Sequence, residues 1–152
     1  PITRFNMHKF HNLNQAYEAE FSSLTNKKPN IDGIFLPDTL PVKPYSGFLI
    51  FKRNTPVGFA IINLSDKVYD VSEFYIIPSF RKQHIGKIFS TTLFNKYKGD
   101  WQVRQISGAS KATTFWRTVI DQYTNGKYLE DSMEDNQWGL VTRQQFNNLD
   151  SD

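Results

Sequence analysis

Several basic side chains stand close together near the middle of the chain. Arg81, Lys82, His84 and Lys87 lie within seven residues, and Gly86 stands among them. The residues before this group favour a strand and those after it follow helical spacing, so the loop is predicted to open a helix. Unpaired amides at a helix N-terminus bind phosphate, and added cations strengthen the attraction. The loop therefore predicts an anion site, with an ordinary basic surface loop as the alternative reading.

The cysteine content, the histidines and the acidic residues limit the kinds of site that the chain can form. The chain has no cysteine, which excludes disulfides and thiolate chemistry. His8 and His11 show no metal-ligand spacing with a carboxylate, so no metal site is predicted. Acidic residues gather at the predicted tip of the last hairpin, as a solvated turn or as a site that favours cations. These residues are Glu130, Asp131, Glu134 and Asp135.

Composition predicts one compact domain over residues 1–152. The chain is 39% hydrophobic and 15% aromatic, which predicts a core rich in packed rings that includes Trp101, Trp116 and Trp138. The net charge of +3 is too small to indicate nucleic-acid binding. The longest apolar runs are too short to cross a membrane, and no leader sequence is recognisable, so we expect a cytoplasmic protein with no membrane partner.

The elements that must position the basic loop can be read from periodicity. Strands are expected at residues 2–5, 47–52, 57–63, 68–77, 101–106, 128–131 and 138–143, and helices at 12–24, 85–98 and 109–123. Residues 68–106 form one strand–helix–strand crossover, whose two strands should be parallel. The predicted fold is a mixed α/β sheet flanked by helices. In such units ligands favour the carboxyl end of the first strand, where the basic loop lies.

The stretch from Glu73 to Lys87 resembles motif A of the GNAT superfamily of N-acetyltransferases. That motif is a strand, a proline, then [R/Q]-x-x-G-x-[G/A] at the start of a helix. Arg81 takes its first place and Gly86 its last, while His84 stands where the first glycine belongs. The likeness covers residues 47–143 and leaves 1–46 as a variable N-terminal part. It is similar in detail to uncharacterised bacterial members with an EFFV…YRRxGIG / FWR pattern.

The resemblance implies a splayed pair of parallel strands that holds acetyl-CoA, and direct transfer of the acetyl group to a primary amine of a small molecule or peptide. The pantetheine would pair with strand backbone, and the pyrophosphate would lie on the basic loop. Family members often dimerise through sheet edges, so a homodimer is compatible with the resemblance. The implied cofactor residues are Tyr75, Ile76, Ile77, Arg81, Lys82, Gln83, His84, Ile85, Gly86 and Lys87.

Direct transfer needs a base that removes the ammonium proton. Glu73 is the predicted base, because its apolar strand could desolvate the carboxylate and raise its pKa. An outward-pointing or salt-bridged Glu73 is the alternative, with Asp70 the next candidate for the base. Tyr123 is predicted to be a core residue, with the role of general acid as the alternative.

Two further departures from the family keep a different class of function open. Ala109 stands where an asparagine is usual, and Trp116 replaces a tyrosine that often acts as general acid. An indole cannot release a proton at neutral pH. The alternative is therefore a non-catalytic domain that binds or senses acyl-CoA. A weak RNA binder is a third reading, but no RNA-binding signature supports it.

Overall fold

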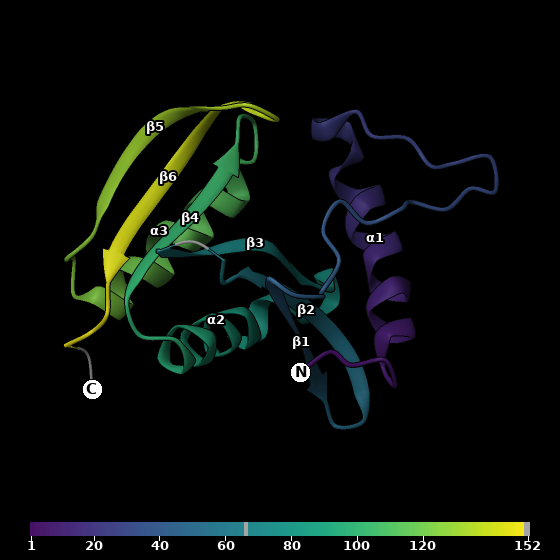
Figure 1. The fold of residues 1–152 in the computed structure, drawn as a ribbon, viewed down its shortest axis with the longest axis horizontal. Helices are drawn as coiled ribbons and strands as arrows, with labels where there is room; N and C mark the ends of the chain where they lie inside the picture. Colours follow the sequence, from purple (N-terminus) through teal and green to yellow (C-terminus); the bar gives the residue numbers. More distant parts are fainter. Residues whose placement is uncertain (66, 151–152) are drawn as a thin grey trace. The chain divides into compact units, whose positions relative to one another are not determined.

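The computed structural model describes residues 1–65 and 67–150, which form two compact units. Unit 1 consists of Pro1–Asn63 and Ser72–Ile85, and unit 2 of Leu64–Val71 and Gly86–Asp152. Hydrogen bonds join six strands in the order β1-β2-β3-β4-β6-β5 (Figure 1). Strand β3 (Val68–Ile76) contributes to both units. This mixed sheet with its helices confirms the predicted α/β class.

Unit 1 contains α1 (Met7–Thr25), the hairpin of β1 (Tyr45–Lys52) and β2 (Thr55–Asn63), the second half of β3, and the short 3-10 helix η1 (Pro78–Gln83). The predicted helix at residues 12–24 is confirmed, and it begins five residues earlier. The predicted hairpin is confirmed with a two-residue turn, in which Arg53 has a φ of 58°. The buried core comprises Ile2, Phe10, Leu13, Phe59, Ile61 and Tyr75.

The predicted strand at residues 2–5 is wrong. The amide of Thr3 donates to the side-chain oxygen of Asn6 at 2.7 Å, which bends the chain into a turn ahead of α1. A side chain that binds nearby backbone in this way competes with strand pairing. Ile2 still contacts the sheet, since its amide donates to the carbonyl oxygen of Gly47 at 2.8 Å.

Unit 2 holds most of α2 (Ile85–Lys96), with β4 (Asp100–Ile106), α3 (Ser110–Thr124) and the hairpin of β5 (Leu129–Asp135) and β6 (Gly139–Asn147). The first half of β3 pairs with β4 in parallel, from Val68 opposite Asp100 to Val71 opposite Val103. This confirms the predicted parallel crossover. Among the described residues the ladder ends at Val71, where β3 passes into unit 1.

Aromatic rings fill the core of unit 2, as the composition predicts. Trp101 and Trp116 are buried, and Trp101 packs against Phe94 with 4.9 Å between ring centroids. The prediction that Trp138 is a core residue is wrong, because its side chain is 37% exposed. It stands in the turn between β5 and β6, where its amide donates to Asp135 Oδ1 at 3.0 Å.

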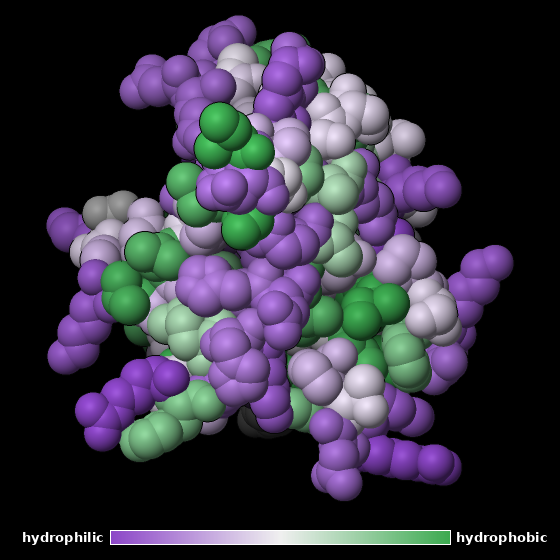
Figure 2. Space-filling model, turned by 90° about the vertical axis from the view of Figure 1, so that its right-hand side faces the viewer, coloured by the Kyte–Doolittle hydropathy of each residue, from purple (hydrophilic) through white to green (hydrophobic). Residues whose placement is uncertain are grey.

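Some hydrophobic side chains reach the surface. Figure 2 shows them in separate groups among hydrophilic ones on the face turned toward the viewer. In the segment between α1 and β1, the exposed apolar residues are Ile31, Ile34, Leu36, Leu40 and Val42. In the described part of the chain, no helix is long and apolar enough to span a bilayer.

Candidate functional site

The basic loop has a backbone shape that suits a close approach by an anion. After η1, His84 adopts a left-handed conformation with a φ of 59°, and α2 begins at the next residue. Glycine takes this conformation without strain, and histidine tolerates it better than most residues do. The first turn of α2 carries no acidic residue. The first-turn amides of a helix generally lack partners within the helix, and a first turn without a carboxylate is suited to bind a phosphate.

Arg81 has partners within unit 1. Its Nε donates to the carbonyl oxygen of Ile76 at 2.9 Å, and its terminal nitrogens form two 2.9 Å contacts with the carboxylate of Glu20 on α1. The guanidinium carbon also lies 5.6 Å from the ring centre of Tyr75. A phosphate that contacts this guanidinium has to compete with Glu20. Lys82, Gln83, His84 and Lys87 are exposed, whereas Ile85 and Gly86 are buried.

At the end of β3, backbone groups point alternately toward β2 and toward the opposite edge of the strand. The amide of Ile77 donates to the carbonyl oxygen of Val57 at 2.9 Å, so this side of the strand faces β2. Because backbone groups alternate along a strand, those of Ile76 face the opposite edge. At that edge the Ile76 carbonyl oxygen accepts the bond from Arg81.

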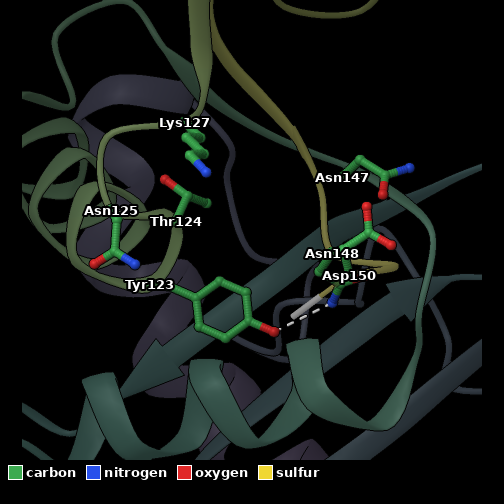
Figure 3. A pocket seen from close by; sticks show the side chains of 7 residues that line it. All are labelled: Tyr123, Thr124, Asn125, Lys127, Asn147, Asn148 and Asp150. Atoms are coloured by element: carbon green, nitrogen blue, oxygen red, sulfur yellow. Dashed lines mark hydrogen bonds between the residues drawn. The ribbon is translucent and has the colours of Figure 1, made fainter. Parts of the chain in front are cut away.

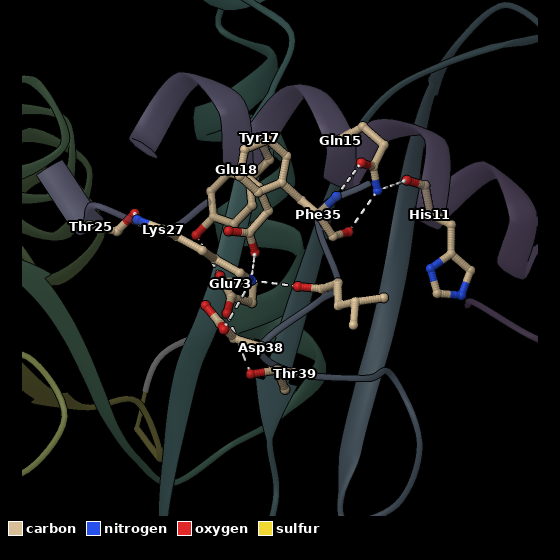
Figure 4. Close-up of polar contacts among 11 residues, drawn as sticks. His11, Gln15, Tyr17, Glu18, Thr25, Lys27, Phe35, Asp38, Thr39 and Glu73 are labelled. Atoms are coloured by element: carbon tan, nitrogen blue, oxygen red, sulfur yellow. Dashed lines mark hydrogen bonds and ion pairs between the residues drawn. The ribbon is translucent and has the colours of Figure 1, made fainter. Parts of the chain in front are cut away.

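Glu73 lies on β3 within unit 1, and its carboxylate receives donors from two distant segments (Figure 4). Tyr17 Oη on α1 donates to Glu73 Oε2 at 2.5 Å, and Thr39 Oγ1 donates to Glu73 Oε1 at 3.4 Å. Neither partner was predicted, because Tyr17 reads only as an apolar member of the α1 stripe and Thr39 as loop. The hydrogen-bond partners of Glu73 are hydroxyl groups, which does not support the alternative of a salt bridge to a lysine or arginine.

The environment of Glu73 changes its acidity. Burial raises the pKa of the Glu73 carboxyl to about 7, and the hydrogen bond from Tyr17 acts in the opposite direction. The negative charges of Glu18 and Asp38 raise this pKa further. A carboxylate with a pKa near neutrality can both hold and release a proton at neutral pH, which is the property that a general base needs.

A lysine joins the two neighbouring carboxylates (Figure 4). Lys27 Nζ lies 3.2 Å from Glu18 Oε1 and 3.0 Å from Asp38 Oδ1, and it also donates to the carbonyl oxygen of Leu36. Burial alone would lower the pKa of Lys27, but the hydrogen bonds to Asp38 and Glu18 raise it above its usual value. Through its contacts with Glu18 on α1 and Asp38 beside Thr39, Lys27 links the segment between α1 and β1 to the helix.

Asp70, the second candidate for the base, is buried in an ion-pair network of unit 2. Arg104 Nε and Nη2 each lie 3.2 Å from its carboxylate oxygens, and Arg104 Nη1 lies 2.8 Å from Asp135 Oδ2. Both oxygens of this carboxylate are engaged by the bidentate guanidinium, which leaves them less accessible to an incoming ammonium group. The geometry therefore favours Glu73 over Asp70.

The placement of the acidic residues at a hairpin tip is wrong. Glu130, Asp131, Glu134 and Asp135 lie along β5, and the turn begins only after Asp135. Pairing with β6 outweighs the low strand propensity of these residues. Arg117 forms two 2.7 Å hydrogen bonds with Glu130, which hold the pKa of its carboxyl below the usual value.

Asp131 has an arginine as well, since Arg143 stands directly opposite it on β6 and bonds both of its oxygens at 2.9 and 2.6 Å. With Asp135 held by Arg104, three of the four acidic residues have arginine partners within unit 2. This pairing favours the reading of a structural, solvated strand over that of a cation site.

Tyr123 belongs to a polar network of unit 2. Its hydroxyl donates to Asn95 Oδ1 at 2.8 Å and accepts a bond from Asn148 Nδ2 at 3.2 Å. It also lines a pocket of about 260 Å³, together with Lys127 after α3 and residues near the end of the chain such as Asp150 (Figure 3). This volume lies below the range usual for small-molecule sites. The bonds of the hydroxyl support the structural role of Tyr123.

The two histidines considered as metal ligands, His8 and His11, both lie on α1. His8 is exposed, and the ring of His11 packs beside Phe10 with 5.2 Å between centroids. Within residues 1–65 and 67–150, no three histidine, aspartate or glutamate side chains are placed to hold a metal ion.

Comparisons with known proteins establish the fold. No protein-family model and no curated protein matches the sequence. Among solved structures, a protein assigned as an acyl-CoA N-acyltransferase from Klebsiella pneumoniae is similar, with a TM-score of 0.62 and 18% identity over 91% of this chain and 89% of the other. A variant of the spermidine N-acetyltransferase from Vibrio cholerae gives 0.61 and 12% identity over 99% and 95% of the two chains.

A third similar structure is the ribosomal-protein-alanine N-acetyltransferase from Brucella melitensis, with a TM-score of 0.61 and 11% identity over 96% of each chain. At such low identities the likeness concerns the fold. The chain therefore has the fold of the GNAT N-acetyltransferases, which confirms the fold that the motif around Arg81 and Gly86 predicts.

Proposed function

We propose that the protein is an N-acetyltransferase that moves an acetyl group from acetyl-CoA to a primary amine by direct transfer. The observation that carries this proposal is the environment of Glu73. Its carboxylate is half-buried on β3, has a pKa of about 7 and is held by two hydroxyl groups. On a fold that other N-acetyltransferases use, such a group is suited to act as the general base.

The role of Glu73 follows from the acidity of amines. A primary amine is mostly protonated at neutral pH and becomes a nucleophile only after it loses that proton. A carboxylate with an ordinary pKa near 4.5 is a weak base, whereas one near 7 accepts the proton more readily and is still largely ionised at slightly alkaline pH. Glu73 would take the proton from the ammonium group directly or through one water.

Acetyl-CoA would supply the activated acetyl group as a thioester. The edge of β3 that carries the backbone of Ile76 would pair with the pantetheine arm, beside Tyr75 and Ile77. The pyrophosphate would lie on the loop from Arg81 to Lys87. The left-handed turn at His84, the acid-free first turn of α2 and the exposed lysines support this assignment.

The acceptor proposed is the primary amine of a small molecule or a peptide. Two of the similar structures are enzymes whose names specify spermidine and the alanine of a ribosomal protein, and both of these substrates carry amines. Action in the cytoplasm belongs to the same proposal. A homodimer stays a prediction.

A non-catalytic acyl-CoA sensor is the second candidate, and Trp116 favours it. This residue is buried on α3, where its ring packs against Phe115 with 4.9 Å between centroids. An indole cannot supply the proton that the leaving thiolate takes up, but a thiol leaves easily enough for slow transfer without a general acid. Free-thiol release from acetyl-CoA, measured with and without a panel of primary amines, tests the proposal. Amine-dependent release would establish transfer, and binding without release would establish the sensor.

Acetyl-CoA is expected to stabilise the protein against heat. Saturation at about 100 times the dissociation constant adds roughly 2.7 kcal/mol to the free energy of unfolding. For a chain of this size, that corresponds to about 5–10 °C in Tm. Thermal scans with millimolar acetyl-CoA and with matched acetate measure it. An unchanged Tm would contradict both the enzyme and the sensor.

Removal of the Arg81 side chain is expected to weaken acetyl-CoA binding about tenfold. A charge-assisted contact is worth about 1.5–3 kcal/mol, and part of this is offset because the guanidinium must leave Glu20. Calorimetry compares Arg81→Ala with Lys28→Ala, which removes an exposed lysine elsewhere in unit 1. Equal affinities in the two variants would assign the phosphate to backbone amides and lysines alone.

A further inference from the structure

The orientation of the Glu73 carboxylate depends on groups far away in the sequence. Each oxygen has one hydroxyl donor, Tyr17 at 2.5 Å and Thr39 at 3.4 Å. The first contact is within the usual range of strong bonds to a carboxylate, and the second is at the long limit of a hydrogen bond. Tyr17 is therefore the stronger constraint on the carboxylate.

Packing fixes the position of the Tyr17 hydroxyl. The ring centre of Tyr17 lies 5.1 Å from that of Phe21, 5.4 Å from that of Phe59 and 5.4 Å from that of Tyr75. Contacts on several sides hold the ring, so its hydroxyl has little freedom to leave the carboxylate. Burial and the charge of Glu73 raise the pKa of Tyr17 well above 10. The hydroxyl consequently remains a hydrogen-bond donor throughout the neutral range.

We propose that Tyr17 is a positioning residue whose hydroxyl orients the Glu73 carboxylate and sets the pH range in which that carboxylate accepts a proton from the amine. The inference rests on the proposed function, since it presupposes that Glu73 is the base. Tyr17 touches neither the amine nor the thioester in this role. It acts through Glu73 by stabilising the ionised carboxylate.

Other charged groups face the same carboxylate and must stay constant in a test. Glu18 comes from α1 and Asp38 from the segment between α1 and β1, and both raise the pKa of Glu73. Lys27 is bonded to each of them. Replacement of Tyr17 by phenylalanine leaves these three residues and the ring packing in place, so the hydroxyl is the only group removed.

The variant Tyr17→Phe is expected to move the acid limb of the kcat/KM profile upward by about 1–2 pH units. Loss of a hydrogen bond to the ionised carboxylate is expected to raise the pKa of Glu73 by about 1–2 units. Because the pKa of Glu73 is about 7 in the unmodified protein, such a rise would reduce the ionised fraction of Glu73 at pH 7, and transfer should fall about 5- to 50-fold. At pH 9.5 the Glu73 carboxylate is mostly ionised in both the unmodified protein and the Tyr17→Phe variant, so their transfer rates should agree within about twofold. Thr39→Val should shift the limb less, because its bond is longer.

An NMR titration of the labelled Glu73 carboxyl carbon compares the pKa of Glu73 in the two proteins without a measurement of enzyme activity. An upward shift of its midpoint in Tyr17→Phe supports the inference, and an unchanged midpoint overturns it. Failure of the proposed function would be seen separately, as an absence of transfer in the unmodified protein. The matched control is Tyr69→Phe, which removes a hydroxyl from a ring that packs against Trp101 in unit 2. It should leave the Glu73 midpoint unchanged.

Combination with Glu73→Gln separates positioning from a general loss of structure. If Tyr17 acts through the carboxylate, adding Tyr17→Phe to Glu73→Gln should reduce transfer no further. An additional 5- to 50-fold loss in the double variant would mean that Tyr17 acts by another route, which would overturn the inference.

Discussion

Glu73→Gln is expected to lower turnover about 100- to 10,000-fold at neutral pH, while acetyl-CoA binds as before. Glutamine has nearly the same shape and can still accept the hydrogen bond from Tyr17, so packing around the site is preserved. It cannot take up a proton, and a positioned general base contributes typically 10²- to 10⁴-fold. The loss should appear in kcat rather than in the affinity for acetyl-CoA, measured by calorimetry.

The matched control for this variant is Asp121→Asn, which neutralises an exposed carboxylate on α3. It should retain the turnover of the unmodified protein. Turnover of Glu73→Gln within a few-fold of that of the unmodified protein would exclude Glu73 as the base. Because Asp70 is held by Arg104, a chain of water molecules would then be the next candidate.

The same substitution is expected to stabilise the fold above pH 7, by up to about 3 kcal/mol. The pKa of Glu73 is about 7 in the folded protein, against an ordinary value of 4.5. Between these two values the folded protein binds more protons than the unfolded chain, so its stability falls as the pH rises. The loss is complete above pH 7, where the folded protein must hold a desolvated, ionised carboxylate.

Glutamine carries no charge and avoids this penalty. Unfolding by urea at a series of pH values measures the difference between Glu73→Gln and the unmodified protein. The difference should be small below pH 4.5, grow between pH 4.5 and 7, and remain constant above that, with a Tm about 6–12 °C higher at pH 8. A difference that does not vary with pH would show that the carboxyl titrates normally. Asp121→Asn again serves as the control.

A gain in stability together with a loss of turnover would identify Glu73 as a group kept at a cost to the fold. Charged groups that are desolvated without a cationic partner are unfavourable, and structural carboxylates such as Asp131 have arginines instead. Replacing Asp131 by asparagine should therefore give no such gain, which distinguishes the two kinds of carboxylate in one experiment.

The sequence by itself determined the elements and the order in which they follow. Spacing of apolar residues identified α1, α2 and α3, and the crossover from β3 to β4 required a parallel pair, which the register of Val68 and Asp100 confirms. The position of the basic loop between β3 and a helix was also predicted, whereas the left-handed backbone at His84 was seen only in the structure. These properties depend on residues a few positions apart, which is the range over which periodicity and motifs carry information.

Only the tertiary structure decided which side chains meet. Tyr17 and Glu73 are 56 residues apart, and Arg81 and Glu20 are 61 apart. No periodicity connects such positions, since their contact follows from the packing of α1 against the sheet. For the same reason the acidic residues of β5 read as a turn, because the arginine opposite Asp131 becomes its partner only through the register with β6. The pKa of Glu73 depends on burial and on neighbouring charges that the folded chain brings together. The apolar strand around Glu73 was therefore enough to suggest it as a base, but its pKa of about 7 could be obtained only from the tertiary structure.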